Sequence, residues 1–425
     1  MINLERRSFI KGAAAVSAIT ILKPSTVFGT RANSAVQLGI IGCGNRGTSV
    51  ITSMSKNTNV NIVAMADLFE DQLKVAKEKL DGLNADKGFG KIKSSNIYQG
   101  SKAFMELLNN KDVEAVLISS PAYTHPEFVE AAIAAGKHIY CEKPVAMDVA
   151  GVKRVEKAGA TINGKLSMVV GFQIRHATAY QEMVKRVQEG AIGDIVTAQL
   201  YYLASGLPLK PIANMSKSEA MIRNQFHFRS LSGGILLDQG IHMLDVCSWT
   251  LQKQPLNAMG AGGRDANDAF GDAWNNYQVI YNYPDNVRVS FHSTQLGPNF
   301  GDVCARFMGT KGNATAHYSG GVFIDGENTW DSGIIRHESE NMDQNQQAAG
   351  VFTSSLHDSN ENKVKSFINS ITSGNYLNEA SSGATSTYTA ILGRMAAENA
   401  EQTSWENMKN SNESIDPNLN LAQFD

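Results

Sequence analysis

Three residues of the chain carry side chains that could together move a proton and hold an oxygen atom: Lys143, Asp238 and His242. The unperturbed pKa of histidine lies near neutrality, which suits His242 to proton transfer in both directions. Asp238 lies four residues before His242, so in a helix the two share a face, and Asp238 could orient the imidazole or hold a neighbouring hydroxyl. These residue types suit the removal of a hydroxyl proton while a hydride leaves the neighbouring carbon.

Lys143 directly precedes Pro144, and a residue before proline favours an extended backbone, which would aim the lysine off the edge of a sheet. Partial burial beside a positively charged group would lower the pKa of the lysine amine. Lys143 could then hydrogen-bond an oxygen atom or share the role of base.

An acceptor for the hydride is indicated by a glycine-rich turn, residues 42–47, that lies between two apolar runs. Gly42 allows the tight turn, and Gly44 lets the backbone approach a pyrophosphate. Gly47 lets the following helix pack closely against the strand. The pattern predicts a dinucleotide-binding unit whose phosphates lie at a helix N-terminus.

Asp67 ends the second apolar run and follows Gly47 by roughly the 20 residues that place an acid on a ribose 2′-hydroxyl. Because a carboxylate repels a 2′-phosphate, we expect NAD rather than NADP, although Arg46 could soften that preference.

Strands alternate with helices as far as residue 172, which predicts a doubly wound parallel sheet with ligands at the carboxyl ends of its strands. Ser120 and Lys143 follow two such ends. The pattern predicts strands at 113–119, 138–141 and 166–172, helices at 71–83, 101–109 and 128–135, and a polar loop at 84–99.

The second half of the chain changes from a helical to an alternating pattern past Pro255, which predicts a largely antiparallel sheet with a hairpin turn at residues 284–286. We therefore expect an NAD-binding Rossmann domain at 35–172 and an α+β domain at 173–425 with a large, open, mixed sheet. Further expected elements are a helix at 180–188, a strand at 194–203, an irregular segment at 203–234, a helical segment at 236–249, and helices at 364–371 and 386–402.

The N-terminal 34 residues match a twin-arginine export signal, with Arg6 and Arg7 followed by a short apolar region at 12–22. This predicts a periplasmic protein with no membrane span after the signal is removed. Export by this route moves folded proteins, which agrees with a cofactor loaded in the cytoplasm. Since no nicotinamide pool exists outside the cytoplasm, the cofactor would have to pass its hydride on without being released.

Composition excludes several classes of partner. With 42% hydrophobic residues, the 425-residue chain can form two large cores. The formal charge is −3 and no basic run occurs beyond the N-terminus, so nucleic acid is not an expected partner. The four cysteines lie far apart without a C-x-x-C pair, so we expect buried thiols and no metal site.

Four stretches of the chain resemble the glucose–fructose oxidoreductase/inositol dehydrogenase/rhizopine catabolism (Gfo/Idh/MocA) family: 42–47, 120–125, 135–144 and 238–242. The resemblance spans about residues 36–312 and implies that Lys143, Asp238 and His242 are the catalytic set. It also implies a mixed open sheet in the second domain, and such an exposed sheet is often used to form homo-oligomers.

The resemblance and the strand ends together predict a binding site for cofactor and substrate. Arg175 and His176 fall where the family lines its active site, and His227 and Arg229 lie in the long irregular segment, where they could touch substrate hydroxyls. The expected cofactor-binding residues are Gly42, Gly44, Asn45, Arg46, Gly47, Asp67, Ser120, Pro121, His125, Glu142 and Lys143.

We therefore expect an NAD(P)-dependent oxidoreductase that acts on a secondary hydroxyl of a sugar, glycoside or cyclitol with a tightly bound cofactor. Two alternatives stay open. One is a redox-neutral, NAD-dependent glycoside hydrolase, although the intact Glu142-Lys143-Pro144 run is more similar to the dehydrogenases. The other is a non-catalytic, NAD-bound carbohydrate-binding protein.

Overall fold

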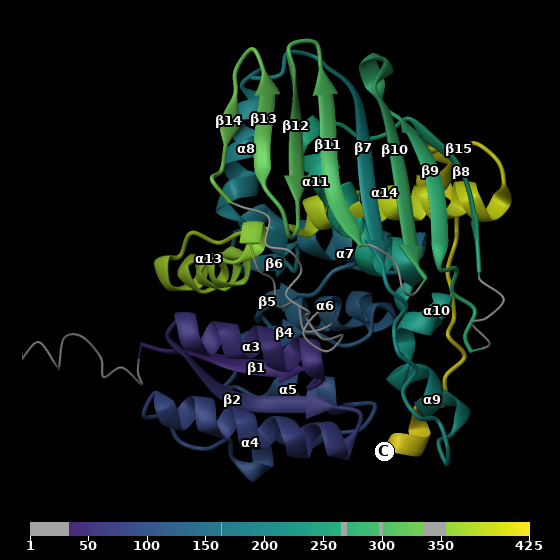
Figure 1. Cartoon of the computed structure of the whole chain (residues 1–425). Helices are drawn as coiled ribbons and strands as arrows, with labels where there is room; N and C mark the ends of the chain where they lie inside the picture. Colours follow the sequence, from purple (N-terminus) through teal and green to yellow (C-terminus); the bar gives the residue numbers. More distant parts are fainter. Residues whose placement is uncertain (1–33, 163, 265–269, 297–300, 335–353) are drawn as a thin grey trace, which may run out of the picture. The chain divides into compact units, whose positions relative to one another are not determined.

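Six strands of the amino-terminal half form a parallel sheet in the order β3-β2-β1-β4-β5-β6 (Figure 1). This is the order of a dinucleotide-binding sheet, with its switch point between β1 and β4, so the predicted fold class is confirmed. The elements are β1 (Val36–Ile41), α3 (Asn45–Asn57), β2 (Val60–Asp67), α4 (Glu70–Asp86), β3 (Ile97–Gln99), α5 (Ala103–Asn109), β4 (Ala115–Ile118), α6 (His125–Ala134), β5 (His138–Cys141), α7 (Val149–Ala160) and β6 (Met168–Val170).

The structure, a computed structural model, describes residues 34–162, 164–264, 270–296, 301–334 and 354–425. The predicted export signal therefore lies outside the described residues except for Ser34. Residues Val36–Asp425 belong to one compact unit. Within the described ranges, no helix combines the length and apolar character needed to cross a bilayer.

The polar loop expected at residues 84–99 is wrong at both ends. Helix α4 continues to Asp86, and residues 97–99 form the edge strand β3. Asn84 is buried, and its polar side chain is satisfied there by two hydrogen bonds to β2. It accepts one from the Ile62 amide (3.1 Å) and donates one to the Ile62 carbonyl (2.8 Å). A polar residue that suggested a loop thus joins the end of α4 to β2.

Nine strands of the carboxyl-terminal half form a mixed sheet in the order β14-β13-β12-β11-β7-β10-β9-β8-β15. Among the described strands of this second sheet, only β7 and β10 pair in parallel, so the predicted mostly antiparallel sheet is confirmed. The strands are β7 (Ile195–Ala204), β8 (Asn257–Gly263), β9 (Asn276–Asn282), β10 (Arg288–Gln295), β11 (Asp302–Gly309), β12 (Gly312–His317), β13 (Val322–Gly326), β14 (Trp330–Asp331) and β15 (Thr403–Ser404).

One face of this sheet is covered by helices, and α11 and α14 pass behind it in Figure 1. The alternating pattern predicted past Pro255 is present in β10, because Val289 and Phe291 are fully buried whereas Ser290 and His292 are half-buried. The helices are α8 (Thr178–Gln188), α9 (Lys217–Arg223), α10 (Arg229–Ser232), α11 (Ile241–Leu251), α13 (Ser359–Ser373), α14 (Ala380–Asn399) and α15 (Trp405–Asn410).

Two features of this half differ from the sequence analysis. The segment expected to be irregular, 203–234, contains the short helices α9 and α10. Strand β8 was not predicted, since its glycines give no alternating pattern. A Cβ atom on Gly260 or Gly262 would lie 2.7 or 2.4 Å from a carbonyl oxygen of β9, so only glycine allows the two strands to approach this closely.

Helix α13 connects the two halves of the fold. Its residues Val364, Phe367 and Ile368 are buried in the same apolar cluster as β1 and β2 of the first sheet. This packing brings the carboxyl-terminal part of the chain against the dinucleotide-binding unit and places Lys363, at the start of this apolar face, near the strand ends.

Candidate active site

The glycine turn has the shape that a dinucleotide requires. Gly42 has a φ of +94°, and a Cβ on Gly47 would lie 2.1 Å from the Gly42 carbonyl oxygen. A Cβ on Gly44, in contrast, would meet nothing within 4 Å, so open space lies beside this residue at the start of α3. Gly42 and Gly47 are therefore required for the backbone of the turn, whereas Gly44 leaves room for a phosphate.

Asp67 lies beside this turn and organises its backbone. The carboxylate accepts hydrogen bonds from the amides of Cys43 (2.7 Å) and Phe69 (2.9 Å). Burial raises the pKa of Asp67, and these two hydrogen bonds partly oppose that rise. Each carboxylate oxygen keeps a further lone pair, so Asp67 can still accept a ribose hydroxyl.

A cavity of about 520 Å³ lies along these residues, within the usual size range of cofactor sites. Of the predicted cofactor-binding residues, Gly42, Gly44, Asp67, Ser120 and Pro121 line it. The other predicted cofactor-binding residues are not part of this lining: Asn45, Arg46, Gly47, His125, Glu142 and Lys143.

Arg46 pairs with Glu142, which engages the guanidinium that was expected to soften the discrimination against NADP. Its guanidinium nitrogens lie 2.9 and 3.0 Å from a Glu142 carboxylate oxygen. Burial raises the pKa of Glu142, but the charges of Arg46, Lys363 and Lys143 outweigh it and hold that pKa below its usual value. The carboxylate therefore stays ionised between these cations.

The expectation that His125 contacts the cofactor needs correction. Both of its ring nitrogens lie against backbone carbonyls, Nδ1 at 2.7 Å from Pro144 and Nε2 at 2.9 Å from Ser120. The buried ring therefore joins the segments that follow β4 and β5, and both of those segments carry predicted site residues. We assign His125 a structural role.

Lys143 and Asp238 meet across the two halves of the fold. The Lys143 amine donates a hydrogen bond to the Asp238 carbonyl and lies 3.4 Å from its carboxylate. Asp238 belongs to a π-helical turn, Leu236–Gly240, that continues into α11. The turn and α11 confirm the predicted helical segment. The proposed link between Asp238 and His242 is not observed in the described structure, because Asp238 pairs with the lysine instead.

His242 lies on the first turn of α11 and is buried between the rings of Phe172 and Tyr318, each 6.3 Å away. Its Nδ1 atom has no hydrogen-bond partner among the described residues. Burial lowers the pKa of His242 well below 6.5, and the positive charges of Lys143, Arg46 and Lys363 lower it further. The imidazole is thus neutral at pH 7 and has a buried nitrogen free to accept a proton.

Lys363 is a member of this site that the sequence analysis missed. It is completely buried, its amine lies 3.9 Å from Glu142, and within the described ranges that amine has no hydrogen-bond partner. Burial and the charge of Arg46 lower its pKa to about 7. The helix was predicted only from residue 364, whereas α13 begins at Ser359 and therefore includes Lys363. The available signal was the position of Lys363 one helical turn before the apolar Phe367.

Arg175, a predicted substrate-binding residue, is paired with Asp245 of α11. Its guanidinium grips both oxygens of Asp245 at 2.8 to 3.1 Å and lies 5.7 Å from the centre of the Trp249 ring. Its neighbour His176 has a pKa lowered to about 4 by burial and by the charges of Lys363 and Arg175. His176 is therefore neutral at pH 7, and the nearby buried Lys363 contributes to this.

The two residues predicted from the long segment have different surroundings. His227 lines the dinucleotide cavity, so it lies on the cofactor side of the site. Arg229 is bound by Glu398 at 2.9 Å and by Glu413 at 3.4 Å, and this ion-pair cluster gives it a structural role. The expectation that Arg229 touches substrate hydroxyls is therefore replaced by this assignment.

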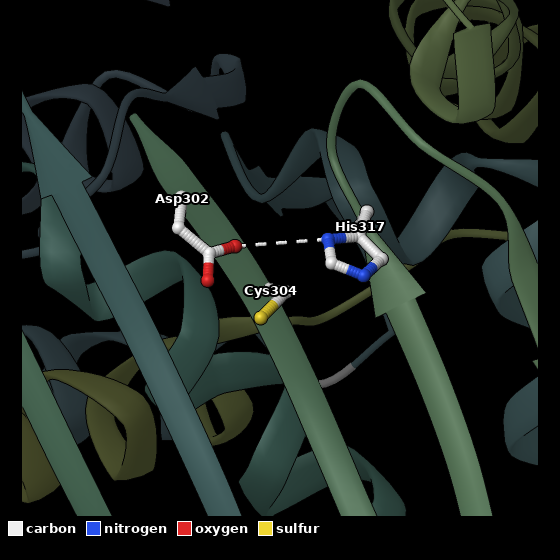
Figure 2. A group of neighbouring side chains, drawn as sticks. All are labelled: Asp302, Cys304 and His317. Carbon is white, nitrogen blue, oxygen red and sulfur yellow. Dashed lines mark ion pairs between the residues drawn. The ribbon is translucent and has the colours of Figure 1, made fainter. Parts of the chain in front are cut away.

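Three residues of types that can bind a metal ion lie close together on the second sheet, although the sequence analysis predicted no metal site. Asp302 and Cys304 on β11 and His317 on β12 face one another, with ligand atoms within 4.8 Å (Figure 2). Arg306 lies 3.7 Å from one Asp302 oxygen and His317 lies 3.7 Å from the other. Because Arg306 already brings a cation to Asp302, and burial raises the pKa of Cys304 to about 12, we assign the group to an ion-pair cluster. The four cysteines are free and buried, as expected.

These observations define a class of protein: an α/β protein with a dinucleotide site at the switch point of its first sheet and a lysine–histidine pair where the second half meets that sheet. The chain matches the oxidoreductase family with an NAD-binding Rossmann fold at residues 36–171, and the Gfo/Idh/MocA C-terminal domain at residues 180–315. It therefore belongs to the Gfo/Idh/MocA family of oxidoreductases.

Among its relatives, the myo-inositol 2-dehydrogenase of Thermotoga maritima is 26% identical over 238 residues, covering 56% of this chain and 61% of that protein. The chain thus spans about three fifths of the length of this relative and of the inositol 2-dehydrogenase of Rhizobium meliloti. The inositol 2-dehydrogenase of Pseudomonas fluorescens strain SBW25 is 34% identical over 163 residues, which cover 38% of this chain and 44% of that protein.

Solved structures show the same fold over most of the chain. The scyllo-inositol dehydrogenase of Lactobacillus casei, solved with bound NAD(H) and scyllo-inositol, has a TM-score of 0.65 at 22% identity and covers 88% of this chain and 99% of its own. The aldose-aldose oxidoreductase of Caulobacter crescentus, solved with glycerol, has a TM-score of 0.65 at 19% identity, with coverages of 87% and 99%.

Proposed function

We propose that the protein is an NAD-dependent dehydrogenase for a secondary hydroxyl of a cyclitol or sugar, with Lys143, Asp238 and His242 as its catalytic set. The observation that carries this proposal is the unpartnered Nδ1 of neutral His242 within the field of the Lys143 amine. Oxidation of a carbinol requires a base that takes the hydroxyl proton and a hydrogen-bond donor that stabilises the oxygen. His242 and Lys143, from the two halves of the fold, supply these two groups.

The residues divide the chemistry between them. His242 takes the hydroxyl proton at Nδ1, and Lys143 donates a hydrogen bond to the same oxygen as negative charge develops on it. Asp238 holds the lysine amine in place through its carbonyl and carboxylate. The cofactor, when bound along the glycine turn and Asp67, supplies the acceptor for the hydride.

The cyclitol class is supported by the relatives, several of which are inositol 2-dehydrogenases, and by the neighbour solved with scyllo-inositol. The aldose-aldose oxidoreductase among the neighbours keeps sugars within the proposal. Relatives that are dehydrogenases favour net oxidoreduction over redox-neutral hydrolysis and over a non-catalytic binding role. Release of the aglycone from a chromogenic glycoside without an added acceptor would reverse this preference.

The test begins with the protein as purified. Denaturation and chromatography of the released nucleotide should yield NAD, and addition of myo-inositol or scyllo-inositol to the native protein should produce absorbance of reduced nicotinamide. A panel of aldoses identifies the alternative substrate class. If no polyol or sugar changes the absorbance of protein loaded with NAD, the proposed activity is wrong.

NAD is the proposed cofactor because Asp67 places a carboxylate at the ribose end of the cavity. We expect Asp67→Asn to weaken NAD binding about tenfold, the change that a loss of about 1.4 kcal/mol produces, and to improve NADP binding by reducing repulsion. Asparagine retains one acceptor for the Cys43 or Phe69 amide, so the turn persists. Fluorescence titration with NADH and NADPH measures both affinities, and unchanged discrimination would show that Asp67 does not set the preference.

We also propose that the protein is exported by the twin-arginine route and retains its cofactor, with a second carbohydrate accepting the hydride. Arg6, Arg7 and the apolar region at 12–22 support export, and fractionation of cells expressing the full chain tests it. Retention predicts steady turnover with two sugars and no added NAD. A strict requirement for added NAD would contradict it.

The open face of the second sheet is the proposed contact with a second copy of the chain. Met259 and Ile280 face each other across β8 and β9 and are each 44% exposed. Light scattering of the purified protein tests this proposal, and a monomer at all concentrations would contradict it.

A further inference from the structure

Two segments distant from the glycine turn in sequence form the outer wall of the dinucleotide cavity. One comprises α9 and the following turn, Lys217–His227, and the other is the C-terminus, Leu421–Asp425. Together we call them the clasp. Arg223 and His227 of the first segment line the cavity, as do Leu421 and Asp425 of the second. In Figure 1 the C-terminus lies beside α9.

Both segments of the clasp hold the same aromatic ring. Phe69 lies two residues after the ribose acid Asp67, and Phe424 packs its edge against Phe69 with ring centres 5.3 Å apart and planes at 82°. The Arg223 guanidinium lies 3.9 Å from the centre of the Phe69 ring. Since Asp67 marks the adenosine end of the cavity, the clasp covers that end, whereas Lys143 and His242 do not line the cavity.

Polar contacts join each segment of the clasp to the dinucleotide-binding half of the fold. Arg223 forms two parallel hydrogen bonds with Asp71, at 2.9 and 3.0 Å. Asp425 accepts hydrogen bonds from the Ser101 amide at 2.7 Å and hydroxyl at 2.9 Å. Gly100, with a φ of +104°, makes room for the tail, because a Cβ there would lie 2.9 Å from the Asp425 carboxylate.

The two segments are also joined to each other, and the tail is held along its path. The Asn420 amide donates to the Ser218 hydroxyl at 2.9 Å, and the Ile415 amide donates to Asp148 at 2.7 Å. Further upstream, Glu413 pairs with the buried Arg394 at 2.6 Å. The C-terminal residues are therefore a docked part of the fold.

We propose that the clasp closes over the adenosine end of bound NAD and sets the rate at which the cofactor is released. This inference rests on the proposed NAD-dependent function and gives retention of the cofactor a structural basis. Asp71 is 57% exposed and Asp425 is exposed, so each ion pair or hydrogen bond at the rim is individually weak. Release requires all of them to open together, which makes the closed state persistent while allowing the cofactor to be loaded.

The test measures release of NADH from the full chain by stopped-flow fluorescence after mixing with excess NAD. Removal of residues 421–425 and Arg223→Ala are each expected to raise the release rate about tenfold. Gln423→Ala is the matched control, because Gln423 belongs to the same tail but is exposed and does not line the cavity. Its release rate should equal that of the unaltered protein.

Thermal unfolding confirms that each variant is folded before release is measured. A release rate unchanged in both clasp variants would overturn the clasp, while absorbance changes with inositol in the unaltered protein would still uphold the dehydrogenase. Binding of NADH without any response to polyols or sugars would overturn the proposed activity but leave the release experiment valid. If NADH does not bind to the unaltered protein, both proposals fall.

Discussion

Replacing His242 with glutamine is expected to lower kcat/KM for oxidation of the polyol by about 10²- to 10⁴-fold, the usual contribution of a general base. Glutamine fills much of the space of the imidazole and can still form hydrogen bonds, but it cannot accept the hydroxyl proton. Initial rates of NADH formation with saturating NAD measure the effect.

The dependence of kcat/KM on pH supplies a second test of the same residue. Burial and the charges of Lys143, Arg46 and Lys363 lower the pKa of His242 well below 6.5, so the free enzyme keeps a neutral base down to that pH. The acid limb of the profile should therefore lie below pH 6.5. A limb at or above pH 6.5 would mean that another group is the base.

A matched control is His292, a half-buried histidine of β10 that does not line the dinucleotide cavity. Its ring stacks on Tyr201 with ring centres 5.7 Å apart. His292→Gln should leave kcat/KM close to that of the unaltered protein. An equal loss in the two variants would show that the effect at His242 is structural.

The second large effect is expected from Lys143→Met, which should lower kcat by about 10²- to 10³-fold, as removal of one donor to a developing oxyanion does. Methionine keeps the length of the side chain but removes the hydrogen bond to the substrate oxygen. It also leaves the Asp238 carboxylate without the amine that lies 3.4 Å away.

The measurement for Lys143 is kcat and KM together with the affinity for NADH. A loss confined to kcat supports a role in the transition state, whereas a loss confined to NADH binding would assign Lys143 to the cofactor only. Lys185→Met on α8 is the matched control, because Lys185 is an exposed lysine of a surface helix. This variant should keep the parent kinetics.

These predictions share an electrostatic basis. Arg46 and Lys143 are cations of the site, and Lys363, whose pKa is lowered to about 7, is partly protonated at neutral pH. Glu142 contacts Arg46 and Lys363, and Asp238 contacts Lys143. The excess positive charge favours an alkoxide-like oxygen and holds His242 neutral. The same arrangement therefore prepares both the base and the environment of the reacting oxygen.

Much of the fold could be predicted from the sequence because its signals are local. The glycine turn at 42–47, the apolar runs of the first sheet and the alternation of β10 each depend on residues close together in the chain. β3 and β8 escaped prediction because one is a three-residue edge strand and the other is rich in glycine, so neither has a period that can be recognised.

The candidate site divides in the same way. Residue type, spacing and the family resemblance together predicted Lys143, Asp238 and His242 as the catalytic set. Their partners could not be identified, because hydrogen bonds and ion pairs form between residues as far apart as Arg46 and Glu142, or Lys143 and Asp238. Spacing favoured a contact between Asp238 and His242, but Lys143 arrives from the first sheet and takes that carboxylate.

The sequence by itself determined that a dinucleotide turn, a parallel sheet and a mostly antiparallel sheet would form, since local geometry and hydrophobic periodicity suffice for each. Only the tertiary structure decided that Lys363 is buried beside Glu142, that Arg46 pairs with Glu142, and that the C-terminal residues line the cavity beside Phe69. Long-range packing brings these groups together. Their protonation and exposure depend on neighbours that are distant in the chain, so local sequence patterns do not reveal them.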